Sequence, residues 1–128
     1  MQNWLTGLHA VQRADYAGLY SDHKPQRALP ESTHPVIRTH PITAKKALYV
    51  NSGFTRRIDG LSTAESRSLL QFLFKHVQNP TFQCRFQWQQ NSIAMWDNRC
   101  TQHLAVWDYF PNTRSGIRVT VKGDRPFC

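Results

Sequence analysis

Apolar positions along this chain follow two different periods, and the change between them falls at Pro80. Between Ser62 and Pro80 the apolar side chains recur every three to four positions, which is the spacing of an amphipathic helix. Ser62 and Glu65 form an S-x-x-E capping box at the start, and Pro80 lies just beyond the end. We therefore predict a helix over residues 63–78 whose apolar face packs on the core. The residues of that face are Leu69, Leu70, Leu73, Phe74 and Val77.

Beyond Pro80 the apolar side chains alternate with polar ones, which is typical of strands that are buried on one face. The clearest run begins at Phe82 and ends at Trp88, and residues 89–91 after it predict a polar turn. The whole pattern predicts four strands with tight turns between them. These strands are residues 82–88, 92–96, 104–107 and 117–121, followed by a turn-like end at 123–128.

The first half of the chain combines helical and strand-like segments. An irregular apolar stripe predicts a helix over residues 3–20, and the polar run 21–33 predicts a loop. Residues 36–50 predict a β-hairpin with its turn at 42–46, which ends at the strand breaker 51–53. Closely spaced strands favour an antiparallel sandwich or barrel over βαβ units. The expected fold is mainly β with flanking helices, in one domain of 128 residues.

Basic residues outnumber acidic ones and give the chain a net charge of +8 at pH 7. They are scattered, and the short runs Lys45-Lys46 and Arg56-Arg57 are the densest groups. Nucleic-acid sites concentrate such residues in a patch or stripe. Solvation of the surface is therefore the favoured interpretation, and a nucleic-acid partner is the weaker one.

The cysteines and the apolar runs indicate a compartment. Cys84, Cys100 and Cys128 are widely spaced and match no disulfide or zinc pattern, which favours free thiols in a reducing compartment. The first residues lack the basic and apolar regions of a signal peptide, and no stretch reaches the roughly 18 apolar residues of a membrane span. We expect a cytoplasmic protein without a membrane partner.

The six histidines are the first candidates for chemistry. A non-haem iron site for oxygenation requires two histidines and one carboxylate on one face. No histidine here is followed two positions later by Asp or Glu, so a complete set with H-x-D spacing cannot be built. His34 and His40 would lie about 20 Å apart along a straight strand, too far for one ion, so a turn is favoured there. His103 lies between two predicted strands and is either a metal ligand or a satisfied polar residue.

Two arginines four positions apart, Arg114 and Arg118, are candidates for binding an anion. A guanidinium fork can bind carboxylate, sulfate or phosphate with two hydrogen bonds. Arg118 falls within an apolar strand, where its charge is costly unless it faces an anion or an acidic side chain. Asp97 and Asp108 are the candidate acidic partners, so anion binding and structural pairing both stay open.

Four strings of the chain carry a family resemblance: HPVIRTHPITAKKALYVNSGFTRRIDGL, ESRSLLQFL, WDNRCTQHLAVWDY and RSGIRVTVKGDRPF. Together they resemble the C-terminal half of the taurine dioxygenase family of Fe(II)- and 2-oxoglutarate-dependent dioxygenases. The most specific feature is WDNR-x-T-x-H with one arginine eleven positions after the histidine and another four later. The resemblance runs from Trp4 to Phe127 and implies a partial double-stranded β-helix, or jelly roll.

The resemblance implies roles for four residues. His103 corresponds to the last iron ligand of the family, and Trp96 to a tryptophan close to the iron. Arg114 corresponds to the arginine that binds the distal carboxylate of 2-oxoglutarate. Arg118 corresponds to an arginine near the co-substrate and the anionic group of the substrate. Bidentate binding of a dicarboxylate suits an arginine at the first of these positions.

The family's other two iron ligands lie in an H-x-D motif upstream of the matched region. The resemblance therefore implies that residues 1–128 are the C-terminal part of one catalytic domain and are inactive alone. The whole enzyme is expected to hydroxylate a small anionic sulfonate or similar organic acid. The alternative is a non-catalytic half-barrel that pairs with another chain, and homo-oligomers are compatible with the sequence.

Overall fold

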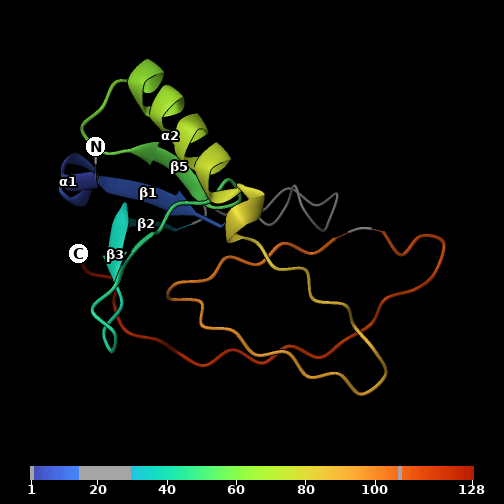
Figure 1. Ribbon diagram of the computed structural model, residues 1–128. Coiled ribbons are helices and arrows are strands. Elements are labelled where there is room, and N and C mark those ends of the chain that lie inside the picture. The colour runs from blue at the N-terminus through green and yellow to red at the C-terminus, as the bar shows by residue number, and fades with distance from the viewer. Residues whose placement is uncertain (1, 15–29, 107) are drawn as a thin grey trace.

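The computed structural model describes residues 2–14, 30–106 and 108–128 (Figure 1). A three-stranded antiparallel sheet and a two-stranded hairpin form its folded part, and extended chain follows them. The elements are α1 (Gln2–Thr6), β1 (His9–Arg13), β2 (Glu31–Pro35), β3 (Ile37–Thr39), β4 (Lys46–Leu48), β5 (Thr55–Ile58), α2 (Thr63–Val77) and the 3₁₀ turn η2 (Pro80–Phe82). The larger sheet has the order β2-β1-β5, α2 packs on β5, and β3 pairs with β4.

Helix α2 confirms the prediction for residues 63–78. Its N-cap Ser62 accepts a hydrogen bond from the backbone N–H of Glu65, and the Glu65 carboxylate accepts one from the backbone N–H of Ser62. Both halves of the capping box are therefore present. Leu70 and Leu73 are buried on the face that the apolar spacing identifies.

Replacing Ser62 with alanine is expected to lower the free energy of unfolding by about 1 kcal/mol, because an N–H of the first turn loses its acceptor. Urea denaturation of the chain measures this change. Ser68→Ala is the matched control, since Ser68 is exposed on the same helix and its hydroxyl donates to the Ala64 carbonyl oxygen (3.0 Å). Alanine is the best helix former, so this control should be neutral or slightly stabilising. Equal losses in the two variants would contradict the role of the cap.

The predicted helix over residues 3–20 is wrong for its middle part. The helix ends at Thr6, and His9–Arg13 form β1, the central strand of the larger sheet. Strand β1 pairs with β2 and β5 on its two sides, so interstrand hydrogen bonds and burial override the helical apolar stripe. Gly7, a weak helix former, follows the end of α1. Residues 15–20 of that prediction lie outside the described residues.

The loop predicted for residues 21–33 is also wrong at its end, because Glu31–Pro35 form β2. Its residues 21–29 lie outside the described part. Strand β2 is at the edge of its sheet, where a polar sequence and a proline are tolerated. The TRRI sequence of β5 has no alternating apolar pattern, and this strand was not predicted.

The β3–β4 pair confirms the hairpin predicted for residues 36–50. Ile37 lies opposite Leu48, and Thr39 lies opposite Lys46. The backbone N–H of His40 continues this pairing by donating to the Lys45 carbonyl oxygen (2.9 Å). The hairpin therefore holds residues 38 and 40 in a fixed position beside the extended part of the chain.

The hydrophobic core lies between the larger sheet, α2 and the hairpin. Ser66 joins two of these layers, because its buried hydroxyl accepts a hydrogen bond from the backbone N–H of Ile58 (2.8 Å). The helix that packs on the edge strand β5 thus supplies the acceptor for one of its backbone N–H groups. The core residues are Leu5, Ala10, Val36, Val50, Ile58, Leu70 and Leu73.

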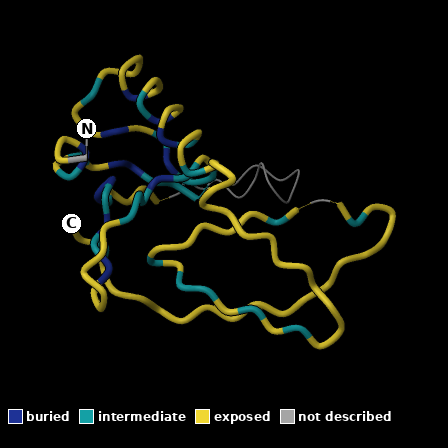
Figure 2. Tube along the Cα trace, viewed as in Figure 1, coloured by how far each residue is buried: buried dark blue, intermediate teal, exposed yellow. Residues whose placement is uncertain are grey.

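The described residues from 83 to 128 contain no strand, so the prediction of four strands is wrong for this structure. A strand needs a neighbour for its backbone hydrogen bonds, and most of this segment is exposed extended chain (Figure 2). Phe86 and Trp88, on the face predicted to be buried, are 53% and 54% exposed. The turn predicted at 89–91 is confirmed by a hydrogen bond from the Ser92 N–H to the Gln89 carbonyl oxygen (3.1 Å).

Candidate functional site

Residues 96–103, which we call the WDNR loop, are folded around the side chain of Asp97. The Asp97 carboxylate accepts hydrogen bonds from the backbone N–H of Arg99 (2.8 Å) and from its guanidinium (2.7 Å to Nη2). The Asp97 carbonyl oxygen accepts from the backbone N–H groups of Cys100 (3.2 Å) and Thr101 (2.9 Å). One aspartate therefore closes the turn that separates Trp96 from His103.

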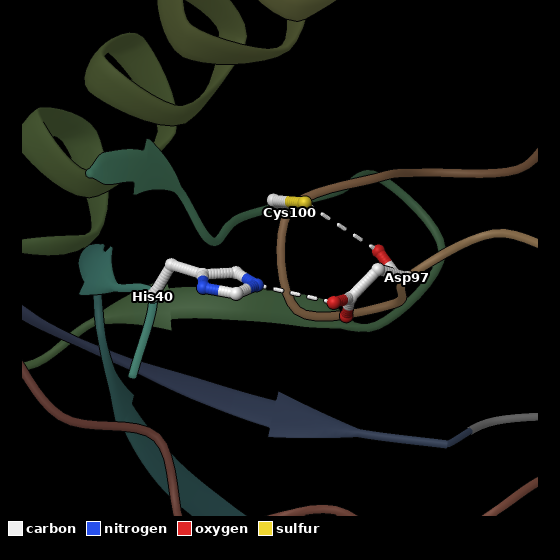
Figure 3. A group of neighbouring side chains, drawn as sticks. All are labelled: His40, Asp97 and Cys100. Atoms are coloured by element: carbon white, nitrogen blue, oxygen red, sulfur yellow. Dashed lines mark hydrogen bonds and ion pairs between the residues drawn. The ribbon is translucent and has the colours of Figure 1, made fainter. Parts of the chain in front are cut away.

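The hairpin holds the WDNR loop at both of its ends. His40 Nε2 lies 3.1 Å from Asp97 Oδ2, and Figure 3 shows the imidazole of His40 pointing at this carboxylate. The Gln102 amide donates to the carbonyl oxygen of Val50 (2.8 Å) just beyond β4. His40 is only 7% exposed and the Asp97 side chain is partly exposed, so water is excluded from the histidine side of their contact. The loop position is thus fixed by contacts with residues far away in the sequence.

The backbone around His40 determines which ring nitrogen carries the proton. The N–H groups of Ile42 and Thr43 both point at His40 Nδ1, each at 3.2 Å. A nitrogen that accepts hydrogen bonds cannot itself carry the proton of a neutral imidazole. The proton therefore lies on Nε2, which donates to Asp97. This arrangement supports the turn that the sequence favoured for His40.

The same proton argues against a metal ion next to His40. Ligand atoms of His40, Asp97 and Cys100 lie within 4.8 Å of one another, which makes them the one group of metal-ligand type in the described residues. A metal would need the lone pair of Nε2 and would displace the two backbone donors from Nδ1. These residues form a hydrogen-bonded anchor for the loop.

Positive and polar neighbours keep Asp97 ionised. The side chain and backbone N–H of Arg99, and then His40, hold the pKa of Asp97 far below its ordinary value. Arg99 has its own pKa raised by the same contact with Asp97. The carboxylate therefore keeps its acceptor role throughout the neutral and mildly acidic range.

Acid is expected to weaken the folded state through Asp97. Because its pKa is lowered on folding, its stabilising contribution is fully present above the ordinary aspartate pKa of about 3.9. That contribution is lost as the pH falls through the lower pKa of the folded state. Urea denaturation of the chain between pH 7 and pH 3 should show less acid dependence for Asp97→Asn than for the unchanged chain. Asp108→Asn, which removes an exposed aspartate paired with Arg85, is the control; an equal change there would refute the assignment to Asp97.

The WDNR loop presents His103 and Trp96 together. The two ring centroids are 4.7 Å apart with an angle of 34° between the ring planes, and the indole N–H donates to Asn98 Oδ1 (3.0 Å). His103 is exposed, and neither of its ring nitrogens has a hydrogen-bond partner among the described residues. An imidazole with a free lone pair suits a metal. One such ligand does not hold an iron ion, so the described part of this chain does not complete an iron site.

Within the described residues, neither of the two arginines of the predicted site forms a hydrogen bond or ring contact with His103. Arg114 and Arg118 are exposed, and neither forms an ion pair within the described parts of the chain. Structural pairing of Arg118 with Asp97 or Asp108 is wrong, because Asp97 binds Arg99 and Asp108 pairs with Arg85. Their guanidinium groups remain available for an anion.

The sequence did not predict one partly buried ion pair. Arg38 is 4% exposed, and its Nη2 lies 2.9 Å from Asp124 Oδ2 near the C-terminus. Its guanidinium carbon also lies 5.1 Å from the ring centroid of Tyr49. The Thr39 N–H donates to the Phe127 carbonyl oxygen (2.8 Å), so the final residues run beside β3 (Figure 1). The partners are 86 positions apart, and the available signal was a lone arginine in an apolar strand.

Likeness to solved structures defines the class of fold. A taurine dioxygenase from Burkholderia xenovorans matches with a TM-score of 0.65 and 34% sequence identity, over 77% of this chain and 31% of that one. Other oxygenase structures match in the same way, including one described as a putative 2,4-D dioxygenase from the same organism. The predicted partial jelly roll is confirmed as the fold class.

The chain belongs to the taurine catabolism dioxygenase TauD, TfdA family, whose model matches residues 4–120. It is 37% identical to the alpha-ketoglutarate-dependent sulfonate dioxygenase of Saccharomyces cerevisiae, over 98% of this chain and 32% of that protein. It is 38% identical to the alpha-ketoglutarate-dependent sulfate ester dioxygenase of Pseudomonas putida, over 88% of this chain and 40% of that protein. The chain thus spans well under half of the length of these relatives. No helix in the described parts is long and apolar enough to cross a membrane.

Proposed function

We propose that this chain is the C-terminal part of an Fe(II)- and 2-oxoglutarate-dependent dioxygenase that hydroxylates a small sulfonate or similar organic acid. The observation that carries the proposal is the WDNR loop within the family match, with His103 exposed beside Trp96 and its ring nitrogens unpaired among the described residues. The named substrates of two relatives, a sulfonate and a sulfate ester, support an anionic organic substrate.

Four residues of this chain have roles in the proposed enzyme. His103 is the last iron ligand, and Trp96 packs against it. Arg114 binds the distal carboxylate of 2-oxoglutarate through its guanidinium fork, and Arg118 lies near the co-substrate and the substrate anion. When bound, the iron would supply the chemistry by which dioxygen oxidises both molecules: one oxygen atom enters the succinate formed from 2-oxoglutarate with loss of carbon dioxide, and the other enters the new hydroxyl group of the substrate. A taurine-like substrate would then release sulfite.

The remaining parts of the site are proposed to lie outside these 128 residues. The H-x-D ligands and the strands that cover the segment after Phe82 would be supplied by a longer protein that contains this chain. Two observations support this: His103 is a single ligand, and large apolar side chains of the segment are exposed. We expect that protein in the cytoplasm.

The test compares the chain with the longer protein under anaerobic conditions. Fe(II) and 2-oxoglutarate together should give a metal-to-ligand charge-transfer absorption band in the longer protein only. Adding oxygen and a sulfonate should then produce succinate in the same sample. A band and turnover in the chain alone would refute its incompleteness, and their absence from the longer protein would refute the proposed activity.

A second candidate function is a non-catalytic half-barrel that pairs with another chain. The exposed Phe86, Trp88 and Ile117 favour it, since apolar surfaces of this kind mark sites of association. Size-exclusion chromatography of the chain distinguishes it, because a stable monomer argues against pairing.

A further inference from the structure

We infer that β3 and the next residue, His40, form the positioning segment of the proposed site. His40 sets the place of His103, and Arg38 sets that of the segment with Arg114 and Arg118. The expected effect on Fe(II) binding rests on the proposed function. The positioning of the segment by His40 and Arg38 depends only on contacts within the chain. His40 and Arg38 are therefore positioning residues, which act through other side chains.

The two residues stand two positions apart along one extended segment, so their side chains leave it on the same side. Both are buried, and each binds an aspartate from a distant part of the chain. His40 contacts Asp97, 57 positions away, and Arg38 contacts Asp124, 86 positions away. Both ends of the segment that carries the proposed site are thus tied to β3 and the residue that follows it.

Arg99 connects the two contacts into one charge network. It binds the Asp97 carboxylate directly at 2.7 Å. Its charge also acts on Asp124, whose pKa is lowered by a backbone hydrogen bond, by Arg38 and by Arg99. Positive and negative groups therefore alternate from Arg38 through Asp124 and Arg99 to Asp97, which accepts from His40. Removing one member would leave a buried neighbour without its partner, which costs more than the contact itself contributes.

The segment between these contacts has little other support. Residues 104–106 and 108–121 are mostly exposed and contain no strand. The Asp97 and Asp124 contacts, together with the Gln102 to Val50 hydrogen bond, join this region to the folded part. The position of His103 relative to the core consequently depends on the His40–Asp97 contact at one end of the WDNR loop and on the Gln102–Val50 contact at the other.

A pair of substitutions at His40 separates its two hydrogen-bonding roles. The amide oxygen of asparagine lies where His Nδ1 lies, so His40→Asn can still accept from Ile42 and Thr43 but cannot reach Asp97. The longer glutamine places its amide nitrogen near the position of His Nε2, so His40→Gln can still donate to Asp97. Arg38 is left unchanged in both variants, and the two replacements differ by one methylene group.

Nuclear magnetic resonance of the 128-residue chain reads the result directly. The unchanged chain should show the neutral His40 tautomer with its proton on Nε2 and a ring-to-ring cross-peak between Trp96 and His103. His40→Gln should keep that cross-peak and His40→Asn should lose it, while the β3–β4 amide signals report an intact hairpin in both. His103→Ala assigns the peak by removing it. Loss in both variants, or retention in both, would overturn the positioning role.

The Fe(II) affinity of the longer protein is the second measurement. His40→Asn is expected to weaken Fe(II) binding by about 10- to 100-fold, as for other residues that orient a metal ligand, and His40→Gln should recover most of it. The KM for the organic substrate should change little in either variant. Equal Fe(II) affinities in the two variants would contradict the inference. A longer protein that binds no Fe(II) at all would refute the proposed function, and the spectra of the chain would still decide the positioning role.

Discussion

Replacing His103 with alanine is expected to lower the Fe(II) affinity of the longer protein by more than about 100-fold and to abolish its turnover. Loss of a residue that merely orients a ligand costs about 10- to 100-fold in metal affinity, so loss of a ligand itself should cost more. His103 suits this role because its ring is exposed and its nitrogens have no partner within the described residues. Anaerobic titration with Fe(II), followed by the charge-transfer band with 2-oxoglutarate, measures the loss.

His76 provides a matched control for this experiment. Like His103, it is an exposed histidine against an aromatic ring, with 5.2 Å between its centroid and that of Phe82. It lies on α2, away from the WDNR loop in the sequence. His76→Ala should therefore leave Fe(II) binding and turnover unchanged. Full activity in His103→Ala, or equal losses in the two variants, would exclude His103 as the ligand.

Local information explains why some elements could be predicted. The signals for α2 all lie within its own sequence: the Ser62–Glu65 capping box, the apolar spacing and Pro80. The β3–β4 hairpin likewise joins residues that are close along the chain. Short-range hydrogen bonds and side-chain periodicity determine both elements, so the sequence alone predicts them.

Strands whose partners are distant could not be predicted in the same way. His9–Arg13 have an apolar stripe that fits a helix, but β1 is stabilised by pairing with β2 and β5. After Phe82 the error is the opposite one: strands were predicted and none is present among the described residues. The alternating pattern there indicates a face that is suited to burial under another layer. Without neighbouring strands in the described structure, that segment stays extended and exposed. Periodicity indicates which face is suited to burial, and pairing decides whether a strand forms.

In the candidate site, too, local features could be predicted and contacts between distant residues could not. The resemblance identified Trp96 and His103, and the structure stacks their rings against each other. It could not identify His40 as the partner of Asp97, because that contact depends on how the hairpin meets the WDNR loop. The role of Arg38 could not be predicted either, since its partner Asp124 is distant in the sequence.

Replacing Arg114 with alanine is expected to raise the KM for 2-oxoglutarate by about 30-fold or more. Truncating one side of a hydrogen-bonded charge pair costs about 2 to 5 kcal/mol, and each 1.4 kcal/mol is a factor of about ten. Arg114 is exposed and has no ion-pair partner in the described structure, so its fork is available to a carboxylate. Succinate formation by the longer protein, measured against 2-oxoglutarate concentration, gives the KM.

Two further variants separate fork geometry from charge. Arg114→Lys keeps the positive charge but loses the two parallel N–H donors, so its KM should lie between those of the unchanged protein and Arg114→Ala. Arg67→Ala removes an equal charge from the exposed surface of α2 and should leave the KM unchanged. If Arg67→Ala raises the KM as much as Arg114→Ala, the effect comes from the overall positive charge of the protein. If Arg114→Lys matches the unchanged protein, bidentate binding is excluded, and Arg114 would act only as a point charge.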